Sequence, residues 1–122
     1  MKVLVVDDEQ LVRWFMERAL LKKGFTVKCT HSVDTALEIL GAEEFDAVFT
    51  DLKMPEENGA VLVNKLRDFT HPPVTVVCSA YITEELEKQF RAMGVFTLKK
   101  PFKLKELEET LNEINSHLKS YR

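Results

Sequence analysis

Short apolar runs alternate with longer amphipathic segments along the whole of this 122-residue chain. Such alternation is typical of repeated strand and helix units, which build a parallel sheet. The runs are apolar throughout, which predicts strands that are buried on both faces. We therefore expect five strands, at Lys2–Val6, Phe25–Cys29, Ala47–Thr50, Val74–Cys78 and Val95–Leu98.

The segments between these strands carry helical periodicity. They predict helices at Gln10–Lys23, Ser32–Leu40, Asn58–Arg67, Thr83–Met93 and Lys103–Leu118. Expected caps support these bounds: Ser32 and Thr83 at two N-termini, and Gly24, Gly41 and Gly94 just after three helices. Right-handed crossovers between the strands then predict a doubly wound α/β fold. This is a three-layer (βα)5 sandwich with a flavodoxin-like parallel sheet of order 2-1-3-4-5.

Length and composition agree with one soluble domain over residues 1–122. The net charge of −3 gives no overall electrostatic attraction to the phosphates of nucleic acid, so we expect no direct nucleic-acid binding. No apolar run approaches the ~18 residues of a membrane span, and a cytoplasmic location is the default expectation. Cys29 and Cys78 lack ligand spacing and are expected to be buried, reduced strand residues.

Charged and hydroxyl side chains stand where the predicted strands end. Asp7 and Asp8 follow the first strand, Asp51 the third, Ser79 the fourth and Lys100 comes shortly after the fifth. Ligands of such sheets bind outside the carboxyl ends of the strands, where these residues can converge. The sequence therefore predicts one joint site.

Carboxylates that meet in one site need compensating charge. Two like charges ~4 Å apart repel by ~4 kcal/mol at an effective dielectric constant near 20. Lys100 supplies one positive charge, and a Mg²⁺ or Mn²⁺ ion would supply two. Mg²⁺ prefers few carboxylates together with water and phosphate oxygens, so we expect Asp8 and Asp51 as direct ligands and Asp7 as a direct or water-mediated one.

A carboxylate beside such a metal can also attack phosphorus. Asp51 is the predicted nucleophile, which would form an aspartyl phosphate. Lys100 would then clamp the phosphoryl group, and the Ser79 hydroxyl would hydrogen-bond one of its oxygens.

Four motifs together resemble the receiver domain of two-component response regulators. They are Val3-Leu4-Val5-Val6-Asp7-Asp8-Glu9, Asp51-Leu52-Lys53-Met54-Pro55-Glu56-Glu57-Asn58-Gly59, Cys78-Ser79-Ala80 and Lys99-Lys100-Pro101-Phe102. The resemblance covers essentially the whole chain. It implies a non-catalytic signalling domain that promotes its own phosphorylation and dephosphorylation, with a sensor histidine kinase or a histidine phosphotransfer protein as the phosphate donor.

The resemblance implies further details of the site and of the partners. The backbone carbonyl of Lys53 would complete the metal ligands, and the Lys100-Pro101 peptide would be cis. The phosphorylated surface would act on an effector domain or a target protein. The phosphorylated domain could also form a dimer.

One position departs from the family pattern. Many receivers have Tyr or Phe three residues before the clamp lysine, as an aromatic that moves with the switch hydroxyl, but this chain has Thr97 there and Phe96 one residue earlier. Because a one-residue slip along a strand moves a side chain to the other face, Phe96 can be the switch aromatic only if the strand's register has shifted.

Other classes fit the sequence less well. A phosphohydrolase of the haloacid dehalogenase type would need Asp-x-Asp after the first strand, but Glu9 stands at that spacing from Asp7. A flavodoxin would need a phosphate loop rich in Ser, Thr and Gly there. The remaining alternative is a receiver-like interaction module that signals without phosphate.

Trp14 lies at the edge of the predicted core stripe of the first helix, which is formed by Leu11, Val12, Phe15, Met16, Ala19 and Leu20. Partial burial against the rim of the sheet is one interpretation of Trp14. Docking to a kinase helix is the other, because the first helix flanks the acidic site and large exposed aromatic residues often anchor interfaces.

Overall fold

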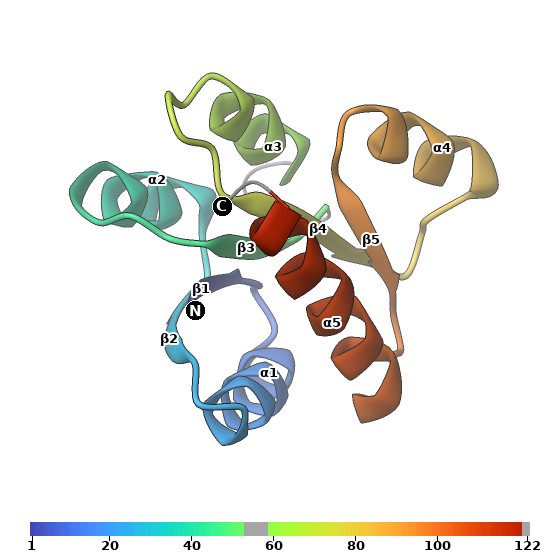
Figure 1. The fold of residues 1–122 in the computed structure, drawn as a ribbon, viewed down its shortest axis with the longest axis horizontal. Helices are drawn as coiled ribbons and strands as arrows, with labels where there is room; N and C mark the ends of the chain where they lie inside the picture. The colour runs from blue at the N-terminus through green and yellow to red at the C-terminus, as the bar shows by residue number, and fades with distance from the viewer. Residues whose placement is uncertain (53–58, 121–122) are drawn as a thin grey trace.

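A computed structural model describes residues 1–52 and 59–120, which form five strands and five helices in strict alternation (Figure 1). The strands are β1 (Lys2–Val6), β2 (Thr26–Thr30), β3 (Ala47–Asp51), β4 (Val74–Ser79) and β5 (Phe96–Lys99). The helices are α1 (Gln10–Lys22), α2 (Val33–Ala42), α3 (Gly59–Arg67), α4 (Glu84–Ala92) and α5 (Leu104–Ser120). The described residues contain no helix long and apolar enough to cross a membrane.

The strands form one parallel sheet of order β2-β1-β3-β4-β5, as the sequence predicts. Helices α1 and α5 cover one face, and α2, α3 and α4 cover the other (Figure 1). The first layer packs through Met16, Leu20, Leu107, Leu111 and Ile114, and the second through Ala36, Leu40, Leu62, Leu66 and Phe90. The predicted three-layer α/β sandwich is therefore confirmed.

Most of the expected helix caps are present. Ser32 Oγ accepts a hydrogen bond from Thr35 N at 3.2 Å, and Thr83 Oγ1 accepts one from Leu86 N at 3.1 Å. Gly24 and Gly94 have φ values of 83° and 76°, which favour glycine at these helix ends. The predicted cap at Gly41 is wrong, because α2 continues through it to Ala42.

Three predictions about burial and length also need correction. In α1, Leu11 is 75% exposed and Phe15 is also exposed, because the helix meets the sheet through the narrower stripe of Val12, Met16, Ala19 and Leu20. Cys78 is buried as expected, but Cys29 is half-buried because β2 is an edge strand; both thiols are free. Finally, α5 ends at Ser120, beyond the predicted end at Leu118.

The register of the sheet brings the carboxyl ends of the central strands to one level. Thr50 pairs with Val6, Asp51 with Cys78, and Ser79 with Lys99. Residues that follow β1, β3, β4 and β5 therefore emerge together at one edge of the sheet, where the predicted site lies.

Candidate functional site

Four acidic side chains meet at this edge. Asp7 directly follows β1 and Asp51 is the last residue of β3; both are buried. One ligand oxygen from each of Asp7, Asp8, Glu9 and Asp51 lies within 4.8 Å of the others. Three of these residues are the predicted carboxylates, and Glu9 is an addition that sequence reasoning did not single out. Its position directly after the Asp pair was the available signal.

Lys100 reaches into this cluster from the end of β5. Its Nζ donates hydrogen bonds to Asp7 Oδ2 at 2.7 Å and to Asp51 Oδ2 at 2.9 Å. Burial alone would lower the pKa of Lys100, but the hydrogen bonds and charges of the two aspartates outweigh it and raise this pKa. Lys100 is therefore a fixed positive charge between two carboxylates that belong to different strands.

One ammonium group does not neutralise the cluster. Burial raises the pKa of Asp7, and the charge of Asp51 adds to this effect. The hydrogen bonds from Lys100 and from the Glu9 backbone N–H, the latter 2.9 Å from Asp7 Oδ1, lower the pKa without cancelling the rise. Four acidic side chains also share a single lysine, so a divalent cation would supply positive charge that the cluster lacks.

The donor atoms fit a hard cation. The cluster offers carboxylate oxygens, two of which come from buried side chains, beside exposed Glu9. Mg²⁺ takes such ligands and keeps several waters. The predicted Lys53 carbonyl lies outside the described residues, so the ligand set within them consists of side-chain carboxylates.

Arg13 is a second contributor that sequence reasoning missed. Its Nη1 donates a hydrogen bond of 2.6 Å to the backbone carbonyl of Asp7. This contact ties the first turn of α1 to the end of β1. The six-residue separation carries no recognisable sequence signal, because the contact depends on the turn between the two elements.

Ser79 lies at the same edge, at the end of β4, and is buried. Its Oγ accepts a hydrogen bond from Tyr81 N at 3.2 Å, and its backbone carbonyl accepts one from Lys100 N at 3.0 Å. The peptide bond between Lys100 and Pro101 is cis, which is the isomer that the resemblance implies. The main chain thus couples the hydroxyl-bearing residue directly to the lysine.

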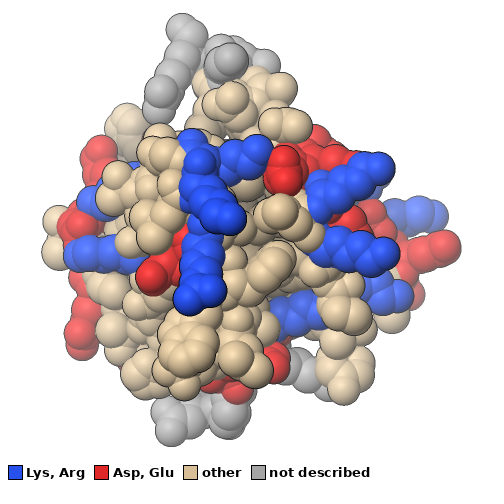
Figure 2. All heavy atoms as spheres, turned by 90° about the horizontal axis from the view of Figure 1, so that it is seen from below, with Lys and Arg blue, Asp and Glu red and all other residues tan. Residues whose placement is uncertain are grey.

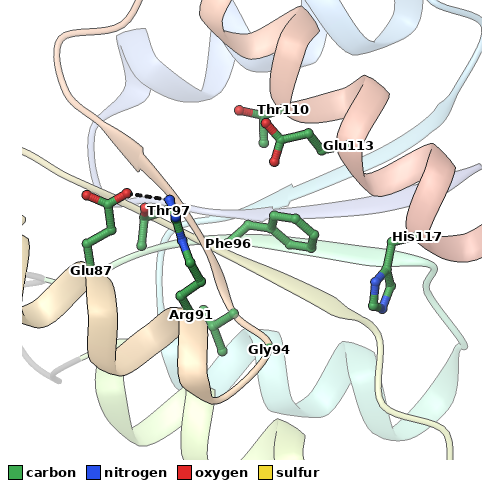
Figure 3. Close-up of a pocket in the computed structure, with 9 residues that line it drawn as sticks. Glu87, Arg91, Gly94, Phe96, Thr97, Thr110, Glu113 and His117 are labelled. Atoms are coloured by element: carbon green, nitrogen blue, oxygen red, sulfur yellow. Dashed lines mark hydrogen bonds and ion pairs between the residues drawn. The ribbon is translucent and has the colours of Figure 1, made fainter.

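Figure 3 shows Phe96 and Thr97 of β5; Thr97 stands where many receivers have an aromatic residue. Thr97 lines a hollow of about 480 Å³ between α4, β5 and α5, together with Glu87, Arg91 and Glu113. Phe96 and His117 also line this hollow, and the Phe96 ring makes an edge contact with His117 of α5, with ring centroids 5.9 Å apart (Figure 3). In the register of β4 and β5, Phe96 pairs with Val76 and Thr97 with Val77, so the two side chains leave opposite faces of the strand. The role of Phe96 as a switch aromatic stays a prediction.

The side chain of Trp14 is 56% exposed on α1. Figure 2 shows the α1 and α5 side of the molecule, where positive and negative side chains are interspersed with uncharged surface. Trp14 is thus an exposed residue, partial burial against the rim of the sheet is not observed, and the ring is available for a contact with another protein.

Comparisons with known proteins place the whole arrangement in one family. The family model described as response regulator receiver domain matches residues 3–112. Sensor kinase CckA of Brucella abortus is 39% identical over 116 residues, which are 92% of this chain and 12% of that protein. Sensory transduction protein LytR of Streptococcus agalactiae is 29% identical over 118 residues, which are 93% of this chain and 48% of that protein. The chain thus spans less than half the length of these two relatives.

Solved structures give the same result. The chemotaxis response regulator CheY4 of Vibrio cholerae superposes with a TM-score of 0.83 at 26% identity, over 93% of this chain and 97% of CheY4. The receiver domain of the hybrid histidine kinase CckA superposes with a TM-score of 0.78 at 28% identity, over 93% of this chain and 98% of that one. The chain therefore belongs to the response regulator receiver domains of two-component signalling systems.

Proposed function

We propose that this domain accepts a phosphoryl group on Asp51 from a phosphohistidine of a sensor histidine kinase or a histidine phosphotransfer protein. The observation that carries the proposal is the convergence of Asp7, Asp51 and Lys100 from three strands, with Nζ within 2.9 Å of both carboxylates. A buried carboxylate beside an ammonium group and further acids is suited to nucleophilic attack on a charged phosphoryl group.

In the proposed transfer, a carboxylate oxygen of Asp51 attacks the phosphorus atom in line with the phosphorus–nitrogen bond of phosphohistidine. The phosphorus–oxygen bond forms while the phosphorus–nitrogen bond breaks, and the electron pair of the broken bond stays on the imidazole nitrogen. A bound Mg²⁺ ion would neutralise charge on the transferred phosphoryl oxygens. Asp7, Asp8 and Asp51 are the side chains that would hold this ion, with the Lys53 carbonyl as the expected fourth protein ligand.

Two other residues would respond to the new phosphoryl group. Lys100 would turn its ammonium group from the carboxylates to a phosphoryl oxygen. The Ser79 hydroxyl, which now accepts a hydrogen bond from Tyr81 N, would donate one to another phosphoryl oxygen. Because these contacts exist only in the phosphorylated state, they bias the domain toward a second arrangement of its surface, which an effector domain or target protein can read.

Incubation with acetyl phosphate and Mg²⁺ tests the proposal directly. Intact-mass measurement should show the gain of one phosphoryl group, which should disappear in chelator and in Asp51→Asn. Asp34→Asn, which removes an exposed carboxylate on α2, is the matched control and should be phosphorylated normally. If the wild-type protein gains no mass and its spectra do not respond to Mg²⁺ with beryllofluoride, the domain is instead an interaction module that works without phosphate.

A further inference from the structure

Glu9 occupies the N-cap position of α1 but does not cap the helix. The described contacts of α1 include no hydrogen bond from a backbone N–H to the Glu9 side chain, whereas Ser32 and Thr83 cap α2 and α4 with theirs. The Glu9 carboxylate is directed elsewhere: its Oε1 lies 3.5 Å from Lys100 Nζ. The side chain of Glu9 is 62% exposed, so it approaches Lys100 from the solvent side of the cluster.

Lys100 and a divalent cation need the same carboxylates. The ammonium group now bridges Asp7 and Asp51, both of which are expected metal ligands. The backbone of Lys100 is held by its hydrogen bond to the Ser79 carbonyl, so the ammonium can leave Asp7 only by rotation of its side chain. Glu9 is the third carboxylate that already forms an ion pair with Lys100.

We propose that Glu9 is a positioning residue for Lys100, which holds the ammonium group when a divalent cation takes over Asp7. In this arrangement Glu9 lowers the cost of metal binding because Lys100, when it gives up Asp7, keeps Glu9 as a partner and can approach it more closely. The inference rests on the proposed function in one respect, namely that Mg²⁺ binds at Asp7, and it adds a role for a residue outside the expected ligand set.

Calorimetric titration of the metal-free protein with Mg²⁺ gives the first test. Glu9→Gln should raise the Kd for Mg²⁺ by about two- to fivefold, the size expected for loss of a largely exposed ion pair. Glu9→Asp should raise it to a similar extent, because the side chain keeps its charge but is one methylene too short to follow Lys100. A wild-type Kd in Glu9→Asp would show that only the charge matters and would overturn the proposal.

A double-mutant cycle separates action through Lys100 from direct contact with the cation. Lys100→Met should lower the Kd for Mg²⁺, because a competing cation is removed. In that background Glu9→Gln should leave the Kd unchanged if Glu9 acts through Lys100. An equal loss of affinity in both backgrounds would make Glu9 a metal ligand and would overturn the positioning role.

Controls keep this result separate from the proposed function. Glu38→Gln, on exposed α2 surface, should bind Mg²⁺ as the wild type does, and thermal melts should show that every variant is folded. If Lys100→Met does not fold, the comparison of Glu9→Asp with Glu9→Gln carries the test. A wild-type protein that binds no Mg²⁺ would refute the proposed function, whereas normal Mg²⁺ binding and phosphorylation by Glu9→Gln would refute this inference alone.

Discussion

The ammonium group of Lys100 lies 2.7 Å from Asp7 Oδ2, although 93 residues separate the two in sequence. The Lys100 side chain is only 12% exposed and that of Asp7 is buried. Water therefore cannot replace Lys100 fully, and the removal of Lys100 leaves the Asp7 carboxylate poorly solvated. The pair joins the end of β1 to the end of β5 across the width of the site.

We predict that Lys100→Met destabilises the metal-free domain by about 3 kcal/mol, because it leaves the buried carboxylates of Asp7 and Asp51 without their counter-charge. Added Mg²⁺ should recover part of this loss, since the ion supplies the missing positive charge. Urea unfolding in chelator and in Mg²⁺ measures both effects. Lys99→Met is the matched control: Lys99 is the exposed neighbour on β5, and its replacement should change the free energy of unfolding little.

Asp51→Asn should have the opposite effect on the metal-free protein. It removes one negative charge from a cluster of four acidic residues around a single lysine, while the contact of Lys100 with Asp7 remains available. We expect a gain in stability of about 1 kcal/mol, which corresponds to a rise in Tm of about 4 °C. A lower Tm than that of the wild type in chelator would contradict the view that repulsion dominates the empty cluster.

The pKa of Asp7 predicts how stability depends on pH in the absence of metal. The folded state raises this pKa above its ordinary value of 3.8, mainly through burial. Between 3.8 and the raised value the folded protein binds more protons than the unfolded chain, so stability falls as the pH rises through this window. The favourable contribution is fully present below 3.8 and is lost at neutral pH.

Asp7→Asn should therefore be more stable than the wild type at pH 7 in chelator, and this difference should shrink as the pH falls toward 3.8. Urea unfolding of both proteins at several pH values measures the difference. Asp34→Asn, which removes an exposed carboxylate, should show no comparable trend. A difference between Asp7→Asn and the wild type that stays constant with pH would show that the titration of Asp7 does not drive it.

The sequence was sufficient to predict the fold because the burial of a strand and the position of its end both follow from residues within that strand. Apolar runs that stop at Asp7, Asp51 and Ser79 mark the carboxyl ends of buried strands, and the parallel topology brings such ends together. The same logic placed Lys100 in the site. Each of these predictions needed only the position of a residue relative to the nearest strand.

The remaining features depend on geometry between elements. Periodicity predicted that Leu11 and Phe15 lie in the core. The helix instead meets the sheet through a narrower stripe, which leaves Leu11 exposed, and the Phe15 ring contacts Phe102. Arg13 and Glu9 reach Asp7 and Lys100 through the turn before α1, whose path no residue pattern specifies. The direction of a side chain that follows a turn could therefore not be predicted from the sequence.

Trp14 offers a test of how a partner docks. It is exposed on α1 and follows Arg13 in sequence. Arg13 donates a hydrogen bond to the backbone carbonyl of Asp7, which lies in the same cluster as Asp51, the proposed phosphoacceptor. If this aromatic side chain anchors a helix of the phosphodonor protein, Trp14→Ala should slow phosphotransfer from a phosphorylated histidine kinase by about tenfold, equivalent to about 1.4 kcal/mol. Phosphorylation by acetyl phosphate, which needs no docking surface, should keep its wild-type rate.

Leu21→Ala is the control for this prediction, because Leu21 is 52% exposed on the same helix but lies two turns farther from the acidic cluster. Its replacement should leave both rates unchanged. The contrast between the two phosphate donors is what separates docking from damage to the site, since a distorted site would slow both reactions. Equal transfer rates from the kinase to Trp14→Ala and to the wild type would leave Trp14 as an edge residue of the fold, with no part in recognition.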